Sequence, residues 1–342
     1  MASVPIQPQP IREWTDVTPE RFHSEIRPLG QPAVMRGLKR DWPLVRAGLQ
    51  SASAAVDYLS GFYRDKPIGT LTVPPSENGR LFYNKDMNGY NFTRSMENMR
   101  NVLRGILKVM GRPEAPAIAM QAIEAPEVLP GFEAEQPMEL VRDAPAKLWI
   151  GNAAHVAPHY DLKENVACVA VGRRRFTLFP PEQLPNLYVG PLDNTPAGAP
   201  ISLVKVSDPD LEAFPRFAEA LAAAQSAELD PGDVIYIPYM WWHGVQALES
   251  FNILVNYWWN DHEARSQVHP STALALAWIA FMDMPPEHRE RWRGMFDHYI
   301  FGDGAMKHVP PHARGVMGEL DEKQLAQVRQ MLARALVSPK NG

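Results

Sequence analysis

Residues 147–181 read KLWIGNAAHVAPHYDLKENVACVAVGRRRFTLFPP, and this stretch decides the fold class. Short runs rich in β-branched and aromatic residues alternate in it with turn residues, a pattern typical of a β barrel or sandwich. The same pattern continues further along the chain. The expected strands lie at residues 147–152, 166–171, 175–179, 234–238 and 252–259. The middle third of the chain is therefore predicted to be mainly β.

Helical periodicity appears on both sides of this β-rich region. Residues 95–110 place apolar side chains on one face, and Ser95 is the expected N-cap. After His269 the pattern is helical again, and residues 321–337 carry an apolar stripe that has to be buried. We therefore expect an N-terminal α/β extension (1–115), a β core (116–265) and a C-terminal helical segment (266–342).

Composition and charge narrow the class of protein. The 342 residues are 45% hydrophobic and 21% charged, as in an ordinary globular protein, and the formal net charge of -5 disfavours a nucleic-acid partner. The single cysteine, Cys168, excludes an internal disulfide, and residues 1–14 lack a secretion signal. The most apolar helical stretch, 273–282, is shorter than the ~20 residues of a membrane crossing. We expect a cytoplasmic protein with no membrane segment.

The strongest candidate site combines His159 and Asp161 with the distant His243. Alternate side chains of an extended strand share a face, so His159 and Asp161 are expected to point the same way. His243 follows a tight turn, Pro231-Gly232-Asp233, and an apolar strand. Two imidazoles and one carboxylate on one side of a metal ion form the facial triad of non-haem Fe(II) oxygenases. The alternative is that each histidine is simply a core residue.

Several spaced elements agree in order and distance with one known family. They are Gly151-Asn152, Pro158-His159-Tyr160-Asp161, Asn165, residues 172–181, residues 231–243 and Asn256-Tyr257-Trp258. In these residues the chain resembles the JmjC/cupin-like Fe(II)- and 2-oxoglutarate-dependent oxygenases, and among them the asparaginyl hydroxylases. The match covers residues 147–259, about a third of the chain. It implies a double-stranded β-helix (jelly-roll) core, Fe(II) held by His159, Asp161 and His243, and 2-oxoglutarate and O₂ as co-substrates.

The resemblance also implies two amide side chains in the co-substrate pocket. Asn165 and Asn256 match the family positions, and strand alternation places Asn256 on the same face as Trp258. A buried amide needs a hydrogen-bond partner. Asn256 is therefore expected either to belong to a site or to close an irregularity in the sheet.

The family places a cation deep in the barrel, and the matching residue here is Arg174. Strand alternation turns Arg174 to the face opposite Arg173 and Arg175. A close member of the family has lysine at this position, whereas a guanidinium holds a carboxylate through two parallel hydrogen bonds. The alternative is that all three arginines are solvated at a turn.

Two positions depart from the family pattern. Val156 stands where a relative has a threonine, and Ala119 stands where it has a tyrosine that contacts the keto acid, so two hydroxyl contacts are missing. Tyr83 is a candidate to replace one of them. The aromatic residues that are candidates to shape a dry pocket, or merely to pack, are Tyr83, Trp241, Trp242 and Trp258. His155 is near enough to His159 in sequence to compete as a ligand.

The expected activity is hydroxylation of a C–H bond in a protein, a peptide or a small molecule, with release of succinate and CO₂. One rival is a cupin metalloenzyme without a keto-acid co-substrate, where more histidines and no buried arginine are usual. Another is a non-catalytic cupin binding module, which needs no complete triad. A histone demethylase is a third alternative, but no chromatin-reading segment or basic tail is visible.

Apolar helical faces in residues 271–284 and 321–337 predict a homodimer built on the C-terminal helices. The resemblance points the same way, because the related hydroxylases are similar dimers. The alternative is that both helices pack on the barrel of their own chain.

Overall fold

The computed structural model describes residues 7–261 and 268–337. The chain divides into two compact units, one ending at Asn260 and one beginning at Asp261. The expected boundary at 265/266 falls among residues 262–267, which lie outside the described residues. Within the described ranges, no helix has both the length and the apolar character that crossing a membrane requires.

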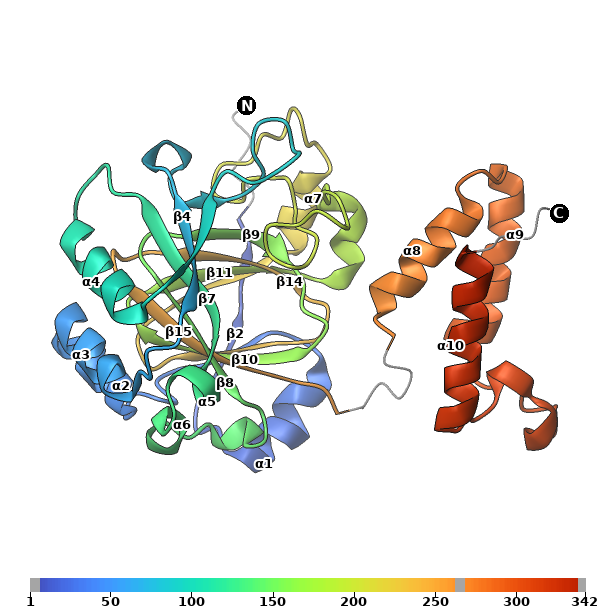
Figure 1. Ribbon diagram of the computed structural model, residues 1–342, viewed down its shortest axis with the longest axis horizontal. Helices are drawn as coiled ribbons and strands as arrows, with labels where there is room; N and C mark the ends of the chain where they lie inside the picture. The colour runs from blue at the N-terminus through green and yellow to red at the C-terminus, as the bar shows by residue number, and fades with distance from the viewer. Residues whose placement is uncertain (1–6, 262–267, 338–342) are drawn as a thin grey trace. The chain divides into compact units, whose positions relative to one another are not determined.

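The first unit contains two β-sheets (Figure 1). The larger sheet has the order β2 (Arg12–Trp14), β3 (Ala33–Met35), β13 (Val234–Ile237), β10 (Glu164–Val171), β15 (Asn252–Trp259), β8 (Ala146–Gly151), β7 (Ala117–Glu124), β4 (Ile68–Val73) and β6 (Thr93–Glu97). The smaller sheet has the order β1 (Gln9–Pro10), β12 (Gln225–Leu229), β11 (Arg174–Phe179), β14 (Trp242–Ala247), β9 (His155–His159) and β5 (Arg80–Leu81).

The inner faces of the two sheets share one apolar core. Phe176 and Leu178 of the smaller sheet cluster with Val169, Ile235 and Leu254 of the larger one. These residues alternate along their strands with side chains on the opposite face, because successive side chains of a strand point to opposite sides. The fold is the expected double-stranded β-helix, or jelly roll.

Helices cover the outer face of the larger sheet. They are α1 (Pro19–Arg21), α2 (Pro43–Gln50), α3 (Ala52–Phe62), α4 (Met99–Val109), α5 (Ala125–Val128) and α6 (Phe132–Glu135). Apolar residues of α2, α3 and α4 form one cluster with the outward side chains of the sheet. A further helix, α7 (Phe217–Ala223), packs Phe217 against Phe179 at the end of β11 in the smaller sheet.

The expected helix at 95–110 begins later than the sequence indicated. Residues 93–97 form strand β6, which pairs with β4, so Ser95 lies in a strand and the prediction that it caps the helix was wrong. Asn98 takes the role, accepting hydrogen bonds from the backbone N–H groups of Arg100 and Asn101.

The N-terminal third does more than pack on the β core. It supplies β1 and β5 to the smaller sheet and β2, β3, β4 and β6 to the larger one. Both sheets therefore extend across the expected boundary at residue 115, and residues 7–260 lie in one compact unit.

The second unit contains α8 (Pro270–Phe281), α9 (Pro286–Phe296) and α10 (Glu322–Val337). Phe281 of α8 contacts Trp292 and Phe296 of α9, with ring centroids 5.5 and 5.8 Å apart. No residue in the described range 268–337 is buried. The apolar side chains of these helices are therefore exposed or only half-buried within this unit.

Candidate metal centre

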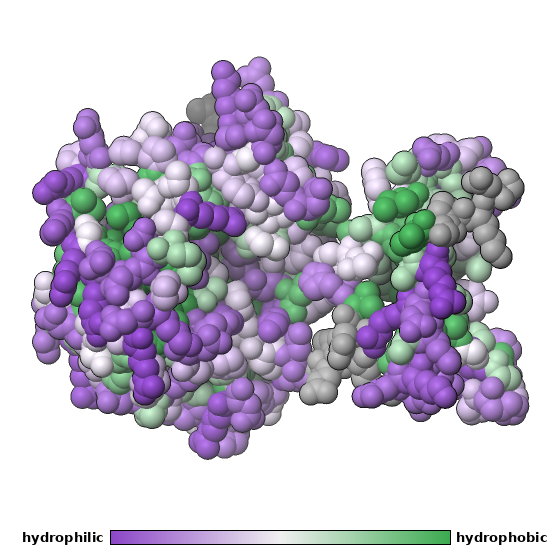
Figure 2. All heavy atoms as spheres, in the orientation of Figure 1, coloured by the Kyte–Doolittle hydropathy of each residue, from purple (hydrophilic) through white to green (hydrophobic). Residues whose placement is uncertain are grey.

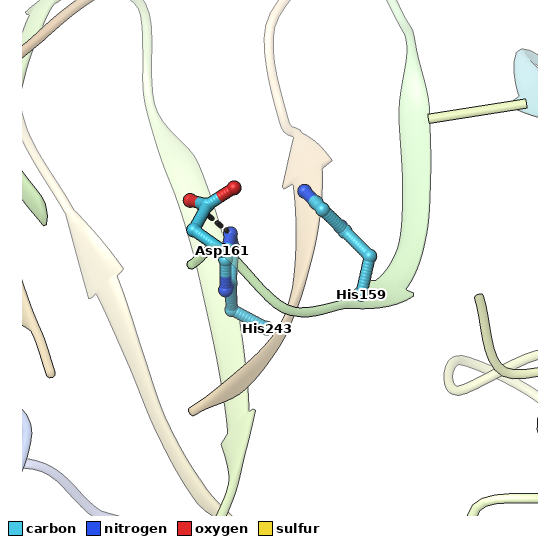
Figure 3. Close-up of side chains that lie close together, drawn as sticks. All are labelled: His159, Asp161 and His243. Carbon is cyan, nitrogen blue, oxygen red and sulfur yellow. Dashed lines mark ion pairs between the residues drawn. The ribbon is translucent and has the colours of Figure 1, made fainter. Parts of the chain in front are cut away.

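His159, Asp161 and His243 meet inside the barrel (Figure 3). His159 ends β9 and lies directly opposite His243 of β14, with ring centroids 4.3 Å apart. Asp161 follows the end of β9 rather than lying in the strand, and its backbone carbonyl accepts a 3.2 Å hydrogen bond from Met240 N–H. One ligand atom from each residue lies within 4.8 Å of the others. The three groups are spaced to share one metal ion.

Each imidazole is oriented by a hydrogen bond of the same kind, to a backbone carbonyl oxygen two residues earlier. Nδ1 of His159 lies 3.0 Å from the carbonyl oxygen of Ala157, and Nδ1 of His243 lies 3.0 Å from that of Trp241. A proton on Nδ1 is donated to the carbonyl in each case, which leaves the Nε2 lone pair for a metal. Nε2 of His243 lies 3.5 Å from Oδ2 of Asp161.

The electrostatics keep His159 uncharged. Burial lowers its pKa to about 4, and the nearby His243 acts in the same direction. A histidine binds a metal as the neutral imidazole, so this environment suits a ligand.

A chain of hydrogen bonds leads away from Asp161 along the inner face of the larger sheet. Oδ2 of Asp161 accepts from Trp258 Nε1 at 3.1 Å and from Asn165 Nδ2 at 3.3 Å. Oδ1 of Asn165 accepts from Asn256 Nδ2 at 3.2 Å. Oδ1 of Asn256 accepts from Trp149 Nε1 at 2.8 Å. The two expected pocket amides are thus paired with each other, and Trp149 is a member that the sequence did not single out.

Arg174 lies at the end of these hydrogen bonds that is far from Asp161. Its side chain is buried, and its Nη2 donates a 3.1 Å hydrogen bond to the carbonyl of Trp149. Its Nε has no partner, and no carboxylate of the described residues lies within 4 Å of the guanidinium. Burial lowers the pKa of Arg174 to about 10. A cation kept in the barrel without a counter-charge is suited to an anionic ligand.

The neighbouring arginines point outward, as strand alternation predicts. Arg175 pairs with Glu228 at 2.5 Å and Arg173 with Glu249 at 2.8 Å. Both side chains are more than two-fifths exposed, whereas Arg174 is 9% exposed.

The two positions that lack a hydroxyl lie close together. Val156 packs against the apolar cluster that contains Ala119. Tyr83 is buried, and its hydroxyl donates a 2.7 Å hydrogen bond to the carbonyl of Asn194. A contact between Tyr83 and the co-substrate therefore stays a prediction.

Of the remaining candidate residues, one directs its side chain to a metal-donor residue and the others direct theirs elsewhere. Trp258 contacts Asp161, as described above. Trp241 lies in the barrel core and donates to the carbonyl of Gly30, while Trp242 packs edge-on against Tyr160. His155 is paired in register with Gln246 and is not a member of the metal-ligand group.

Comparisons with known proteins agree on one domain type. A family model described as "Cupin-like domain" matches residues 19–265. The tRNA wybutosine-synthesizing protein 5 of Gallus gallus is 28% identical over 264 residues, 71% of this chain and 74% of the relative.

Two other relatives match over a smaller part of their length. HSPB1-associated protein 1 of Mus musculus is 25% identical over 305 residues, 83% of this chain and 59% of the relative. Lysine-specific demethylase 8 of Xenopus tropicalis is 35% identical over 113 residues, 33% of this chain and 24% of the relative. The chain thus spans less than two thirds of either of these proteins.

Proposed function

The chain belongs to the cupin-like (JmjC) domain family, and we propose that it is an Fe(II)- and 2-oxoglutarate-dependent dioxygenase that hydroxylates a C–H bond. The observation that carries the proposal is the pairing, in one barrel, of a three-residue metal-donor set with a buried arginine that lacks a carboxylate partner. The metal-donor set fits Fe(II), and the buried arginine fits 2-oxoglutarate.

The donor set fits Fe(II). Two imidazoles and one carboxylate would hold an ion from one side and leave its other side open for small ligands. His159 and His243 have Nδ1 engaged with backbone carbonyls, and Asp161 is held by Trp258 and Asn165. Such outer hydrogen bonds fix the direction of the ligand atoms and support metal affinity.

The buried guanidinium fits a dicarboxylate. Arg174 would hold the carboxylate distal to the metal through charge-assisted hydrogen bonds, and its Nε is available because no described residue uses it. A cupin metalloenzyme without a keto acid has no need of this cation, and a binding module has no need of the complete triad. Both alternatives are therefore less well supported.

Iron bound at the triad, with 2-oxoglutarate and O₂, would supply oxidative decarboxylation to succinate and CO₂ together with insertion of one oxygen atom into the substrate C–H bond. The residues of the chain bind and orient the reactants. Arg174 would position the co-substrate, and Trp258 and Asn165 keep Asp161 in place.

The names of the relatives do not agree on one substrate. One name refers to a tRNA component and another to lysine. The proposal for this chain therefore stays at the level of a C–H bond in a protein, a peptide or a small molecule.

The test is anaerobic reconstitution of the full chain with Fe(II) and 2-oxoglutarate, followed by admission of O₂ and measurement of succinate. Succinate should form only when both additions are present, and the Asp161→Ala variant should form none. If the wild-type protein binds Fe(II) but neither binds nor consumes 2-oxoglutarate, the keto-acid proposal fails and the alternative metalloenzyme is favoured.

We also propose that the chain forms a homodimer through residues 268–337. Within this unit large apolar side chains are exposed, and Figure 2 shows green, apolar surface on these helices. Examples are Trp278, Ile279 and Leu336, which are 69%, 62% and 57% exposed. Exposed apolar area of this kind usually marks an interface, and a two-fold pairing of identical surfaces is the commonest arrangement.

A further inference from the structure

A groove with a volume of about 930 Å³ crosses the outer face of the smaller sheet. Its floor includes Arg175 and Thr177 of β11 and Gly244 of β14. These residues alternate along their strands with Arg174 and His243, which point into the barrel, so the sheet separates the groove from the metal centre. None of the three candidate metal ligands lines it. The volume is in the range of small-molecule sites.

One wall of the groove closely approaches the backbone that precedes β9. Residues 76–80 form this wall, and Gly79 adopts a positive φ of 74°. A Cβ at Gly79 would lie 1.9 Å from the carbonyl oxygen of Ala153, so only glycine permits this approach. The consequence is that Arg80 pairs in register with His155 of β9, and both line the groove.

Positively charged side chains outnumber negatively charged ones in the lining of the groove. Three side-chain cations, Arg80, Arg175 and Lys205, face a single carboxylate, Glu77. Arg175 is neutralised by Glu228, and Lys205 lies 3.5 Å from Asp208 in an exposed pair of little strength.

Arg80 forms no ion pair, although the charge of Glu77 acts on it from a greater distance. No carboxylate in the described part of the chain lies within 4 Å of its guanidinium. It donates instead to the carbonyl of Leu203 at 3.0 Å and lies 3.5 Å above the ring of Phe82. Burial lowers the pKa of Arg80, and burial together with the charge of Lys205 lowers that of His155. An anion beside these groups would offset both effects.

Apolar side chains also line the groove. Pro158, which lies beside Gly244, and Val204 and Val206 are among them. We propose that the groove is a second ligand site, which binds a small organic anion with its phosphate or carboxylate group against Arg80, His155 and Lys205 and its apolar part against Pro158 and Val206. The site is independent of the proposed dioxygenase activity.

The test is calorimetric titration of the full chain with phenyl phosphate and with benzoate, which share an aromatic ring and differ in the anionic group. At least one probe should bind saturably, and the tighter of the two identifies the anionic group. Inorganic phosphate, which has no apolar part, should bind at least tenfold more weakly. Equal affinity for inorganic phosphate would overturn the apolar half of the proposal.

Variants locate the binding. Arg80→Gln should weaken the affinity for the preferred probe at least tenfold, because a charge-assisted hydrogen bond is lost, while Arg80→Lys should retain most of it. The matched control Arg173→Gln, outside the groove, and His243→Ala, in the metal centre, should bind as the wild type does. Failure of both probes to bind, equal binding by Arg80→Gln, or loss of binding in His243→Ala would each overturn the proposal.

Discussion

Trp149 and Asn256 are joined by a 2.8 Å hydrogen bond from the indole Nε1 to the amide Oδ1. The backbone carbonyl of Trp149 also accepts from Arg174, and Asn256 leads through Asn165 to Asp161. Trp149 therefore connects the residue proposed to hold the co-substrate with a proposed metal ligand. Hydrogen bonds of this kind transmit the position of one ligand group to another.

We expect Trp149→Phe to weaken the coupling between metal and co-substrate binding. Phenylalanine keeps the aromatic packing against Trp258 but removes the donor to Asn256, at a cost of about 0.5–1.5 kcal/mol, which corresponds to about two- to tenfold in affinity. The measurement is the Mn(II) dissociation constant with and without 2-oxoglutarate. The coupling is reciprocal, so metal should also strengthen 2-oxoglutarate binding less in the variant.

Trp241→Phe is the matched control for this prediction. Its indole donates to the carbonyl of Gly30, away from the chain of hydrogen bonds, so its removal should leave the coupling unchanged. Coupling as strong in Trp149→Phe as in the wild type would show that these hydrogen bonds do not link the metal site to the co-substrate site. If the wild type binds no 2-oxoglutarate, the proposed function itself fails.

Removing any one metal ligand should abolish metal binding and leave the fold intact. His159→Ala, Asp161→Ala and His243→Ala each leave two donors in a site that already has open positions, and affinity falls steeply with ligand number. Metal content and circular dichroism provide the measurements. His155→Ala, on the same strand as His159 but outside the ligand group, should keep its metal. Full occupancy in a triad variant would refute the assignment of that ligand.

Arg174→Met should weaken 2-oxoglutarate binding while metal stays bound. Methionine fills much of the buried volume but offers no charge, and the loss of a charge-assisted hydrogen bond costs about 1.5–3 kcal/mol, or ten- to hundredfold in affinity. Arg175→Met, one position along the strand, removes outward contacts with Glu228 and Gln246 and should have little effect. Titration of 2-oxoglutarate into the metal-loaded proteins tests both, and a larger loss in Arg175→Met would contradict the assignment.

Local patterns predicted the part of the site that depends on strand alternation. The orientation of Arg174 follows from its place in one strand, and the order of motifs predicted the grouping of His159 with His243. Trp149 lies in a predicted strand, and an inward indole needs an acceptor, yet its partner is fixed only when β8 pairs with β15. That register joins strands that are far apart in the sequence, so a short stretch of sequence cannot predict it.

The same limit explains the errors at the edges of the fold. Ser95 is a good N-cap residue, but pairing of β6 with β4 takes residues 93–97 into the sheet and leaves Asn98 to begin α4. Tertiary pairing thus outweighed the local helix signal. Trp241 and Trp242 are adjacent in sequence and both pack in apolar clusters, one of the two alternatives that the sequence left open. They lie in different clusters, Trp241 in the barrel and Trp242 beneath α7, and the sequence did not separate them.

The full chain should have twice its 38.4 kDa mass in light scattering at micromolar concentration. The reason is that residues 268–337 contain no buried residue, so α8 and α10 carry apolar surface that their own unit does not cover. A chain that ends at Pro310 lacks α10; if it is monomeric with its barrel still folded, the interface includes that helix. Leu332→Glu, on the apolar stripe of α10, should dissociate the dimer, and Gln330→Glu, on another side of the helix, should not. A monomeric mass for the intact chain would end the proposal and favour packing of these helices on the barrel of their own chain.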